Sequence, residues 1–134
     1  MHEYDITLKS LLQRQLQSGV LSSLTGLTVR EWISSELPEV QTRRVDLLGR
    51  TPDERLVHVE LQSHNDLLMA LRMAEYALAI YRRYGQFPTQ LVLYVGQRPM
   101  RMKDTIGGPD CSFRCGMTDI RDLESGPLLA SPPN

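Results

Sequence analysis

The chain has 134 residues, of which 23% are charged and 41% are hydrophobic, and its formal net charge at pH 7 is −1. A chain of this length and composition is expected to fold as one globular domain with a buried core. The near-neutral charge excludes a strongly basic nucleic-acid-binding domain. Any contact with DNA would have to come from local clusters, namely Arg43–Arg44, Arg82–Arg83 and the run from Arg98 to Lys103.

The sequence carries no recognisable targeting or membrane signal. Residues 1–5 are polar and lack the basic-then-apolar layout of a signal peptide. The apolar run at residues 67–81 is interrupted by two charged residues and is too short to cross a bilayer. These features predict a cytoplasmic protein without a membrane partner. In that compartment Cys111 and Cys115 are expected to be free thiols, because they lack the further ligands that a zinc site needs.

The first third of the chain predicts a helix followed by less regular segments. Residues 5–17 have apolar residues at helical spacing, and residues 20–28 form a mixed segment. Residues 29–37 suit either a helical turn or a strand, because they are rich in β-branched and aromatic residues. A neighbouring hairpin needs further strands for stability, which favours the strand.

The most informative stretch is a predicted β-hairpin made of residues 43–49 and 56–62. Two runs of alternating apolar and polar residues flank a turn that is rich in Pro and Asp. If residues whose numbers add up to 106 are paired, Asp46 lies directly opposite Glu60, with their Cβ atoms about 5 Å apart. This register also brings the apolar faces of the two strands together.

Strand parity assigns each side chain of the hairpin to one of two faces. Like charges directly opposite each other destabilise a sheet, so a divalent metal ion is expected between Asp46 and Glu60. The alternative is that these polar side chains are only the solvent face of the hairpin. One predicted face carries Val45, Leu47, Val57, Val59 and Leu61, and the other carries Arg44, Asp46, Leu48, Leu56, His58, Glu60 and Gln62.

A long helix is predicted at residues 66–84, with Asn65 as its N-cap and Gly85 at its end. It is apolar on most of its circumference and is therefore expected to be covered on more than one side. A buried strand follows at residues 90–96, so the strand, helix and strand form a right-handed crossover with parallel strands. The apolar stripe expected on this helix consists of Leu67, Leu68, Leu71, Ala74, Ala77, Leu78 and Tyr81.

The last part of the chain has weaker patterns. Residues 111–117 predict an edge strand and residues 119–123 a last short element. We therefore expect a single domain over residues 1–123, followed at 124–134 by a tail or by the start of a further region.

Several strings of residues resemble a known family. The strings are HEYDITLKSLL, RRVDLLGR, LVHVELQSHND, LRMAEYALAIYRRYG and QLVLYVG. They look like the recombination-promoting nuclease/transposase family of the PD-(D/E)XK nuclease superfamily, over roughly residues 4–121. The resemblance implies an α/β fold with a restriction-endonuclease-like αβββαβ core, in which a mixed central sheet is flanked by helices.

The function implied by this resemblance is that of a Mg²⁺-dependent DNA endonuclease linked to recombination or mobile elements. One alternative is a catalytically inactive nuclease-fold domain that binds DNA or a protein partner. Another is a plain interaction domain whose acidic face holds no metal.

The resemblance also implies a set of site residues. Asp46 and Glu60 would be catalytic carboxylates that bind Mg²⁺ or Mn²⁺, with the carbonyl of Leu61 as a further ligand. Gln62 stands where the superfamily commonly has a catalytic lysine, and it offers a neutral amide that would orient the attacking water. Asp5, from the first helix, is the candidate for an additional acidic residue.

Three more side chains are candidates for supporting roles. His58 lies on the predicted face of Glu60 and is either a partner of the site, a phosphate contact or a surface histidine. Arg72 and Tyr76 share a helix face and would meet a phosphate or support Glu60. Alternatively, Arg72 pairs with Glu75 and Tyr76 lies in the core. Since cutting both DNA strands usually requires two active sites, a homodimer is also expected.

Overall fold

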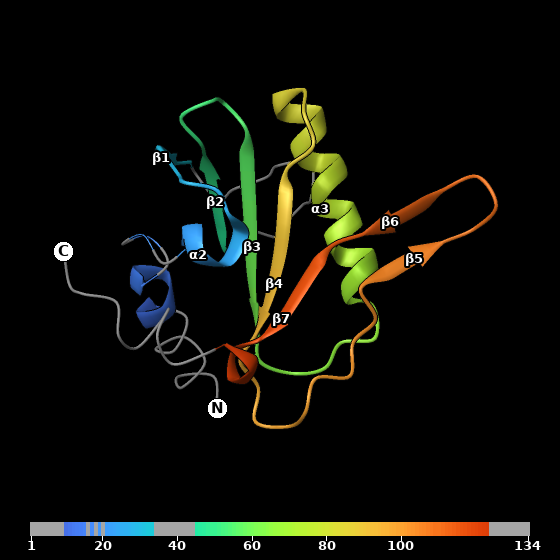
Figure 1. Cartoon of the computed structure of the whole chain (residues 1–134). Helices are drawn as coiled ribbons and strands as arrows, with labels where there is room; N and C mark the ends of the chain where they lie inside the picture. The colour runs from blue at the N-terminus through green and yellow to red at the C-terminus, as the bar shows by residue number, and fades with distance from the viewer. Residues whose placement is uncertain (1–9, 16, 18, 20, 34–44, 124–134) are drawn as a thin grey trace.

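The structure, a computed structural model, describes residues 10–15, 17, 19, 21–33 and 45–123. In this part of the chain a mixed five-stranded sheet carries one long helix on one face, which confirms the predicted α/β class (Figure 1). The strands lie in the order β1 (Glu31–Trp32), β2 (Leu47–Arg50), β3 (Leu56–Gln62), β4 (Thr89–Tyr94) and β7 (Gly116–Asp119). The other elements are α2 (Leu21–Thr25), α3 (Met69–Tyr84), β5 (Thr105–Gly107), β6 (Ser112–Arg114) and the 3₁₀ turn η3 (Ile120–Asp122).

The hairpin forms in the predicted register. β2 and β3 are antiparallel, with Leu47 opposite Val59 and Leu48 opposite His58. β3 has the predicted bounds, whereas β2 begins only at Leu47, after a bend at Asp46. β1 is antiparallel to β2 and confirms a short part of the strand expected at residues 29–37.

The later strands extend the sheet in parallel. β4 is parallel to β3, as expected for a strand–helix–strand crossover, and β7 is parallel to β4. The edge strand predicted at residues 111–117 is divided between β6 and β7. β5 and β6 form a separate two-stranded hairpin that was not predicted, because strands of three residues contain too little pattern to recognise. Figure 1 shows this hairpin projecting past α3.

The start of α3 differs from the prediction, while its end is confirmed. The helix begins at Met69, three residues later than expected, and Asn65 is not its N-cap. The side chain of Asn65 donates instead to the carbonyl of Pro99 (3.0 Å) and accepts from the N–H of Arg101 (2.6 Å). The local cap signal was overridden because this side chain joins the loops that follow β3 and β4. Gly85 ends the helix in the left-handed conformation, with a φ of 76°.

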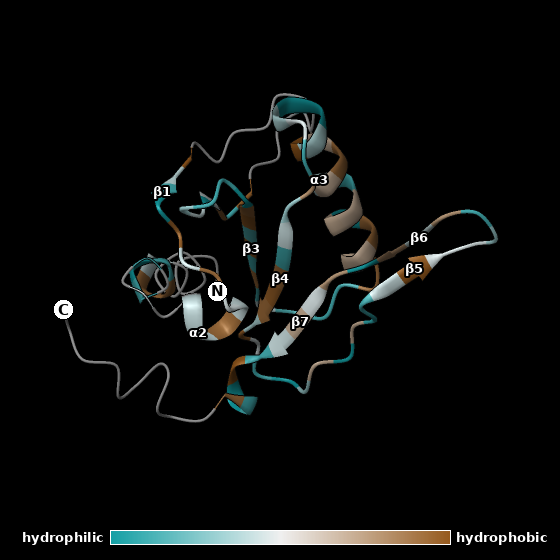
Figure 2. Ribbon diagram, turned by 45° about the horizontal axis from the view of Figure 1, so that its top comes forward, coloured by the Kyte–Doolittle hydropathy of each residue, from teal (hydrophilic) through white to brown (hydrophobic). Residues whose placement is uncertain are grey.

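Most of the apolar stripe predicted on α3 is not the side that the sheet covers. Of the expected apolar stripe, Ala77 is buried, Ala74 is half-buried and the five large side chains are exposed. Because the helix is apolar on two sides, its periodicity did not show which side the sheet covers (Figure 2). Within the described residues, the sheet covers one side of α3 and the β5–β6 hairpin also contacts the helix, while the side with the large exposed residues of the stripe stays open. The buried residues of α3 are Met69, Ala70, Met73, Tyr76, Ala77, Ala79 and Ile80.

The sheet separates two apolar clusters. The cluster under α3 contains Met73, Tyr76 and Val92, and the cluster on the opposite face contains Val59 and residues from the N-terminal segment, including Leu12. Figure 1 shows α2 on the side away from α3, and its Leu24 also packs against that second cluster.

The position of Val45 corrects the predicted faces of the first hairpin strand. Val45 belongs with Leu48 to the cluster under α3 and not with Leu47. The bend at Asp46 interrupts the alternation of side chains, so parity does not extend back across it.

In the part of the chain that the structure describes, no helix is long and apolar enough to span a membrane.

An ion pair joins the end of β7 to the loop after β4. The guanidinium of Arg121 binds both carboxylate oxygens of Asp119 (3.1 and 2.9 Å) and the carbonyls of Gln97 and Arg98 (2.9 and 2.8 Å). Hydrogen bonding from Arg121 holds the pKa of Asp119 below its usual value of 3.8. The ionised carboxylate therefore stabilises the fold above that pH, and its contribution is lost as the pH falls through the lowered pKa.

We predict that Asp119→Asn destabilises the protein at neutral pH and has a smaller effect as the pH falls below about 3.8. Urea unfolding of the wild type and the variant at pH 7 and in acid measures the two differences in free energy. A difference that is the same at both pH values would contradict the role given to the ionised carboxylate.

The two cysteines are predicted to react at different rates. Burial raises the pKa of the Cys115 thiol to about 11, whereas Cys111 is exposed. Because the thiolate is the reactive form, iodoacetamide at mildly alkaline pH should modify Cys111 readily and Cys115 only after unfolding. Mass spectrometry of the native wild type, with Cys111→Ser as the control, measures this. Equal labelling of both thiols would show that Cys115 is accessible.

Candidate active site

Asp46 and Glu60 lie side by side where the pairing of β2 with β3 ends. The N–H of Asp46 donates to Oε2 of Glu60 (2.7 Å), and the N–H of Leu61 donates to Oδ2 of Asp46 (2.8 Å). Each carboxylate thus takes the place of a main-chain acceptor at this end of the hairpin. The predicted juxtaposition of the two acidic residues is present in the structure.

If this hairpin face only met solvent, its side chains would be exposed, but His58 and Glu60 are buried. Glu60 is 4% exposed and His58 is 0% exposed, and the ring of Tyr76 on α3 packs against that of His58. The solvent-face interpretation is therefore wrong for both residues. The main-chain N–H groups of Asp46 and Leu61 also supply part of the neutralisation that the sequence attributed to a metal ion alone.

His58 is a buried link between Glu60 and β4. Its Nε2 lies 2.9 Å from Oε2 of Glu60, and its Nδ1 lies 3.0 Å from Nε2 of Gln90. The same amide nitrogen of Gln90 donates to the carbonyl of Met73 (3.0 Å), which fixes the orientation of that amide. Nδ1 of His58 therefore accepts, and Nε2 carries the hydrogen donated to Glu60.

Tyr76 and Arg72 support the surroundings of the site from α3. The ring of Tyr76 meets the ring of His58 edge to face, with centroids 5.3 Å apart, and is buried. Arg72 pairs with Asp66 at 2.9 Å, whereas one interpretation expected Glu75 as its partner. Burial lowers the pKa of Arg72, but its hydrogen bonds with Asp66 and Tyr76 outweigh this and raise it overall, so the guanidinium stays charged. Tyr76 therefore contacts His58, the partner of Glu60, whereas Arg72 binds Asp66 in the turn before α3.

The remaining site candidates are Gln62, the carbonyl of Leu61 and Asp5. The amide nitrogen of Gln62 donates to the carbonyl of His64 (3.0 Å), at the exposed end of β3. The N–H of Leu61 points toward Asp46, and in an extended strand the carbonyl of a residue points the same way as its N–H. The carbonyl of Leu61 is thus directed to the Asp46 side. Asp5 lies outside the described residues.

In the ranges that the structure describes, no group of three or more His, Cys, Asp or Glu side chains is arranged to hold a metal ion. A site built here would depend on Asp46, Glu60 and the carbonyl of Leu61. These three donors are all oxygen, the ligand type that Mg²⁺ prefers. Oε2 of Glu60 already accepts two hydrogen bonds, and none from the described residues goes to Oε1.

Two residues in this network were missed from the sequence. Gln90 lies opposite His58 in the parallel register of β3 and β4, and Gln13 donates to the main-chain carbonyl of Asp46 (3.1 Å). Gln90 had a usable signal, because it is a polar residue at the start of an otherwise apolar strand. Gln13 had none, since its contact joins residues 33 positions apart.

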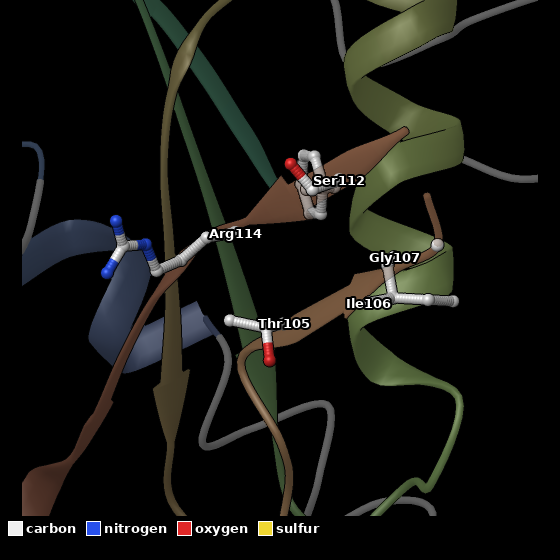
Figure 3. A pocket seen from close by; sticks show the side chains of 7 residues that line it. Thr105, Ile106, Gly107, Ser112 and Arg114 are labelled. Atoms are coloured by element: carbon white, nitrogen blue, oxygen red, sulfur yellow. The ribbon is translucent and has the colours of Figure 1, made fainter. Parts of the chain in front are cut away.

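A hollow of about 390 Å³ lies elsewhere, on the β5–β6 hairpin. None of the candidate residues lines it. Figure 3 shows the side chains of Ile106 and Arg114 pointing in opposite directions, so its lining does not converge on one point. We therefore do not assign the chemistry to this hollow.

No family model matches the chain, and no curated protein or solved structure is significantly similar to it. The arrangement of side chains must therefore carry any functional argument.

The hydrogen bonds of Glu60 predict different effects for two substitutions. Glu60→Ala leaves the N–H of Asp46 and Nε2–H of His58 without an acceptor, and an unpaired buried group costs about 1–3 kcal/mol. Glu60→Gln keeps an oxygen that can accept both bonds, so we expect a free energy of unfolding close to that of the wild type. Chemical denaturation measures both values. Equal destabilisation by the two variants would contradict the structural role of this oxygen.

Proposed function

We propose that the chain is a metal-dependent endodeoxyribonuclease of the PD-(D/E)XK type, related to the recombination-promoting nucleases, in which Asp46 and Glu60 bind Mg²⁺. The observation that carries the proposal is that Asp46, in the bend before β2, and Glu60, in β3, lie side by side, with the carbonyl of Leu61 directed to the same side. The mixed sheet with a crossover helix is compatible with a restriction-endonuclease-like core.

The residues present fit a magnesium ion in their donor chemistry. Mg²⁺ is usually held by one or two carboxylates, with water and phosphate oxygens at its other positions. When bound, the ion supplies Lewis-acid polarisation of the phosphate and a more acidic water. His58 holds one oxygen of Glu60, so its role is to fix the orientation of this carboxylate rather than to contact the phosphate.

Gln62 has a distinct role in this proposal. Its amide nitrogen is bound to the carbonyl of His64, which leaves the amide oxygen to accept a hydrogen bond from a water molecule. A neutral amide positions a water without adding positive charge. We therefore expect slower cleavage than a lysine at this place would give.

A basic loop lies at the same edge of the sheet as the two carboxylates. β3 and β4 are parallel, so the loops that follow them meet at this edge, at the bottom of Figure 1. They are tightly packed, since a Cβ added to Gly96 would lie 2.5 Å from the carbonyl oxygen of Ser63. In this proposal, three exposed cations on the second loop contact the DNA backbone: Arg98, Arg101 and Lys103.

One observation favours the inactive, DNA-binding or protein-binding alternative. Oε2 of Glu60 and Oδ2 of Asp46 already accept hydrogen bonds within the fold, so the two carboxylates have a structural purpose that needs no metal ion. In that case the basic loop would still bind DNA, without cleavage.

The proposal predicts Mg²⁺-dependent cleavage of plasmid DNA by the wild type and at least a hundredfold loss in Asp46→Asn and Glu60→Gln, on the scale expected for removing a group that stabilises the transition state. These substitutions are preferred to alanine because each retains an oxygen for its main-chain donor. Arg114→Gln, a change of an exposed cation on the β5–β6 hairpin, serves as the matched control and should cleave like the wild type.

Nicking by the two variants at the rate of the wild type would identify a contaminating nuclease and refute the enzyme proposal. DNA binding without cleavage by any of the proteins would instead support the inactive alternative.

A further inference from the structure

The side of α3 that faces away from the sheet is apolar and exposed. Leu71 is 38% exposed, Leu78 is 62% exposed and Leu67, in the turn before the helix, is 89% exposed. Beyond the end of the helix, the ring of Phe87 stacks on that of Tyr81 with centroids 4.4 Å apart and lengthens the same surface. We name the outer apolar face of α3 as these residues together with one more leucine: Leu67, Leu68, Leu71, Leu78, Tyr81 and Phe87.

The size of this face exceeds what single chains usually leave in water. Its exposed fractions correspond to an area on the order of 700 Å², whereas the largest apolar patch of a monomer is about 300–600 Å². An interface of standard size buries about 800 Å² on each partner. The outer face is thus large enough to supply most of one side of a stable interface.

The spacing of the face matches the seam by which helices pair. Within α3, Leu71, Ala74, Leu78 and Tyr81 follow one another at intervals of three, four and three residues. This is the heptad spacing of a two-helix seam, and the half-buried Ala74 leaves room for a large side chain from the other helix. A helix with the same spacing is the best complement for such a surface.

The charges beside the seam favour a second copy of this chain in antiparallel orientation. Glu75 and Arg82 are exposed and seven residues apart, on the side of Leu71 and Leu78. Antiparallel pairing of two α3 helices can bring Glu75 of one copy toward Arg82 of the other. By symmetry, Arg82 of the first copy then meets Glu75 of the second. Parallel pairing would instead bring the basic ends of the two helices together, since the last turn carries Arg82 and Arg83.

We propose that the outer apolar face of α3 is the interface of a two-fold symmetric homodimer, formed by antiparallel packing of α3 against α3 of a second copy. The sheet covers one apolar side of the helix and the second copy covers the other. This proposal goes beyond the nuclease function and does not depend on it.

The test is the molar mass of the full chain in solution, from light scattering or sedimentation over a wide range of concentrations. The wild type should have twice the 15.3 kDa mass of one chain, and Leu78→Glu should have the mass of one chain. Leu11→Glu is the matched control, since Leu11 is 56% exposed and its neighbour Leu12 belongs to the cluster on the opposite face of the sheet. This control should remain a dimer. Circular dichroism verifies that each variant is folded.

The orientation is tested by exchanging the charges. Glu75→Arg and Arg82→Glu should each weaken the dimer, and the variant with both changes should regain at least tenfold in affinity over either one. A wild type that stays monomeric, or a dimer whose mass is unchanged in Leu78→Glu, would overturn the proposal. Loss of the dimer in both single charge variants without recovery in the double variant would overturn the antiparallel arrangement.

Discussion

The surrounding structure depends on the hydrogen bonds that the buried carboxylate of Glu60 accepts. A charge with 4% exposure costs several kcal/mol unless hydrogen bonds replace its water. The N–H of Asp46 and the ring of His58 provide those bonds. Gln90 in turn fixes the ring of His58, and α3 covers it with Tyr76. The start of β2, the end of β3 and the contact with β4 are thereby joined in one network.

The same network makes the edge of the sheet suitable for chemistry. One oxygen of Glu60 is held from two directions, so the other is held in a defined direction before any ligand arrives. Pre-organised carboxylates bind a metal ion with less loss of conformational freedom than mobile ones. Burial of Glu60 requires hydrogen bonds, and the same hydrogen bonds orient its carboxylate.

The sequence predicted what depends on local alternation. The hairpin register and the proximity of Asp46 to Glu60 came from strand parity and a recognisable turn. Parity failed at Val45, because the bend at Asp46 breaks it. The partnership of His58 with Gln90 depends on the register between parallel strands joined by a helix, which no local pattern specifies.

The covered side of α3 was not predictable for a different reason. Both sides of the helix are apolar, and only the tertiary structure shows that Met73 faces the sheet while Leu78 faces outward. Asn65 was misassigned as a cap because its contacts, with the loop after β4, are more than thirty residues away along the chain.

The central claim remains that Asp46 and Glu60 form a metal site. Calorimetric titration with Mn²⁺ tests it most directly. The claim predicts a binding event in the wild type that is absent from folded Glu60→Gln, and equal binding or equal absence of binding in the two proteins would contradict it.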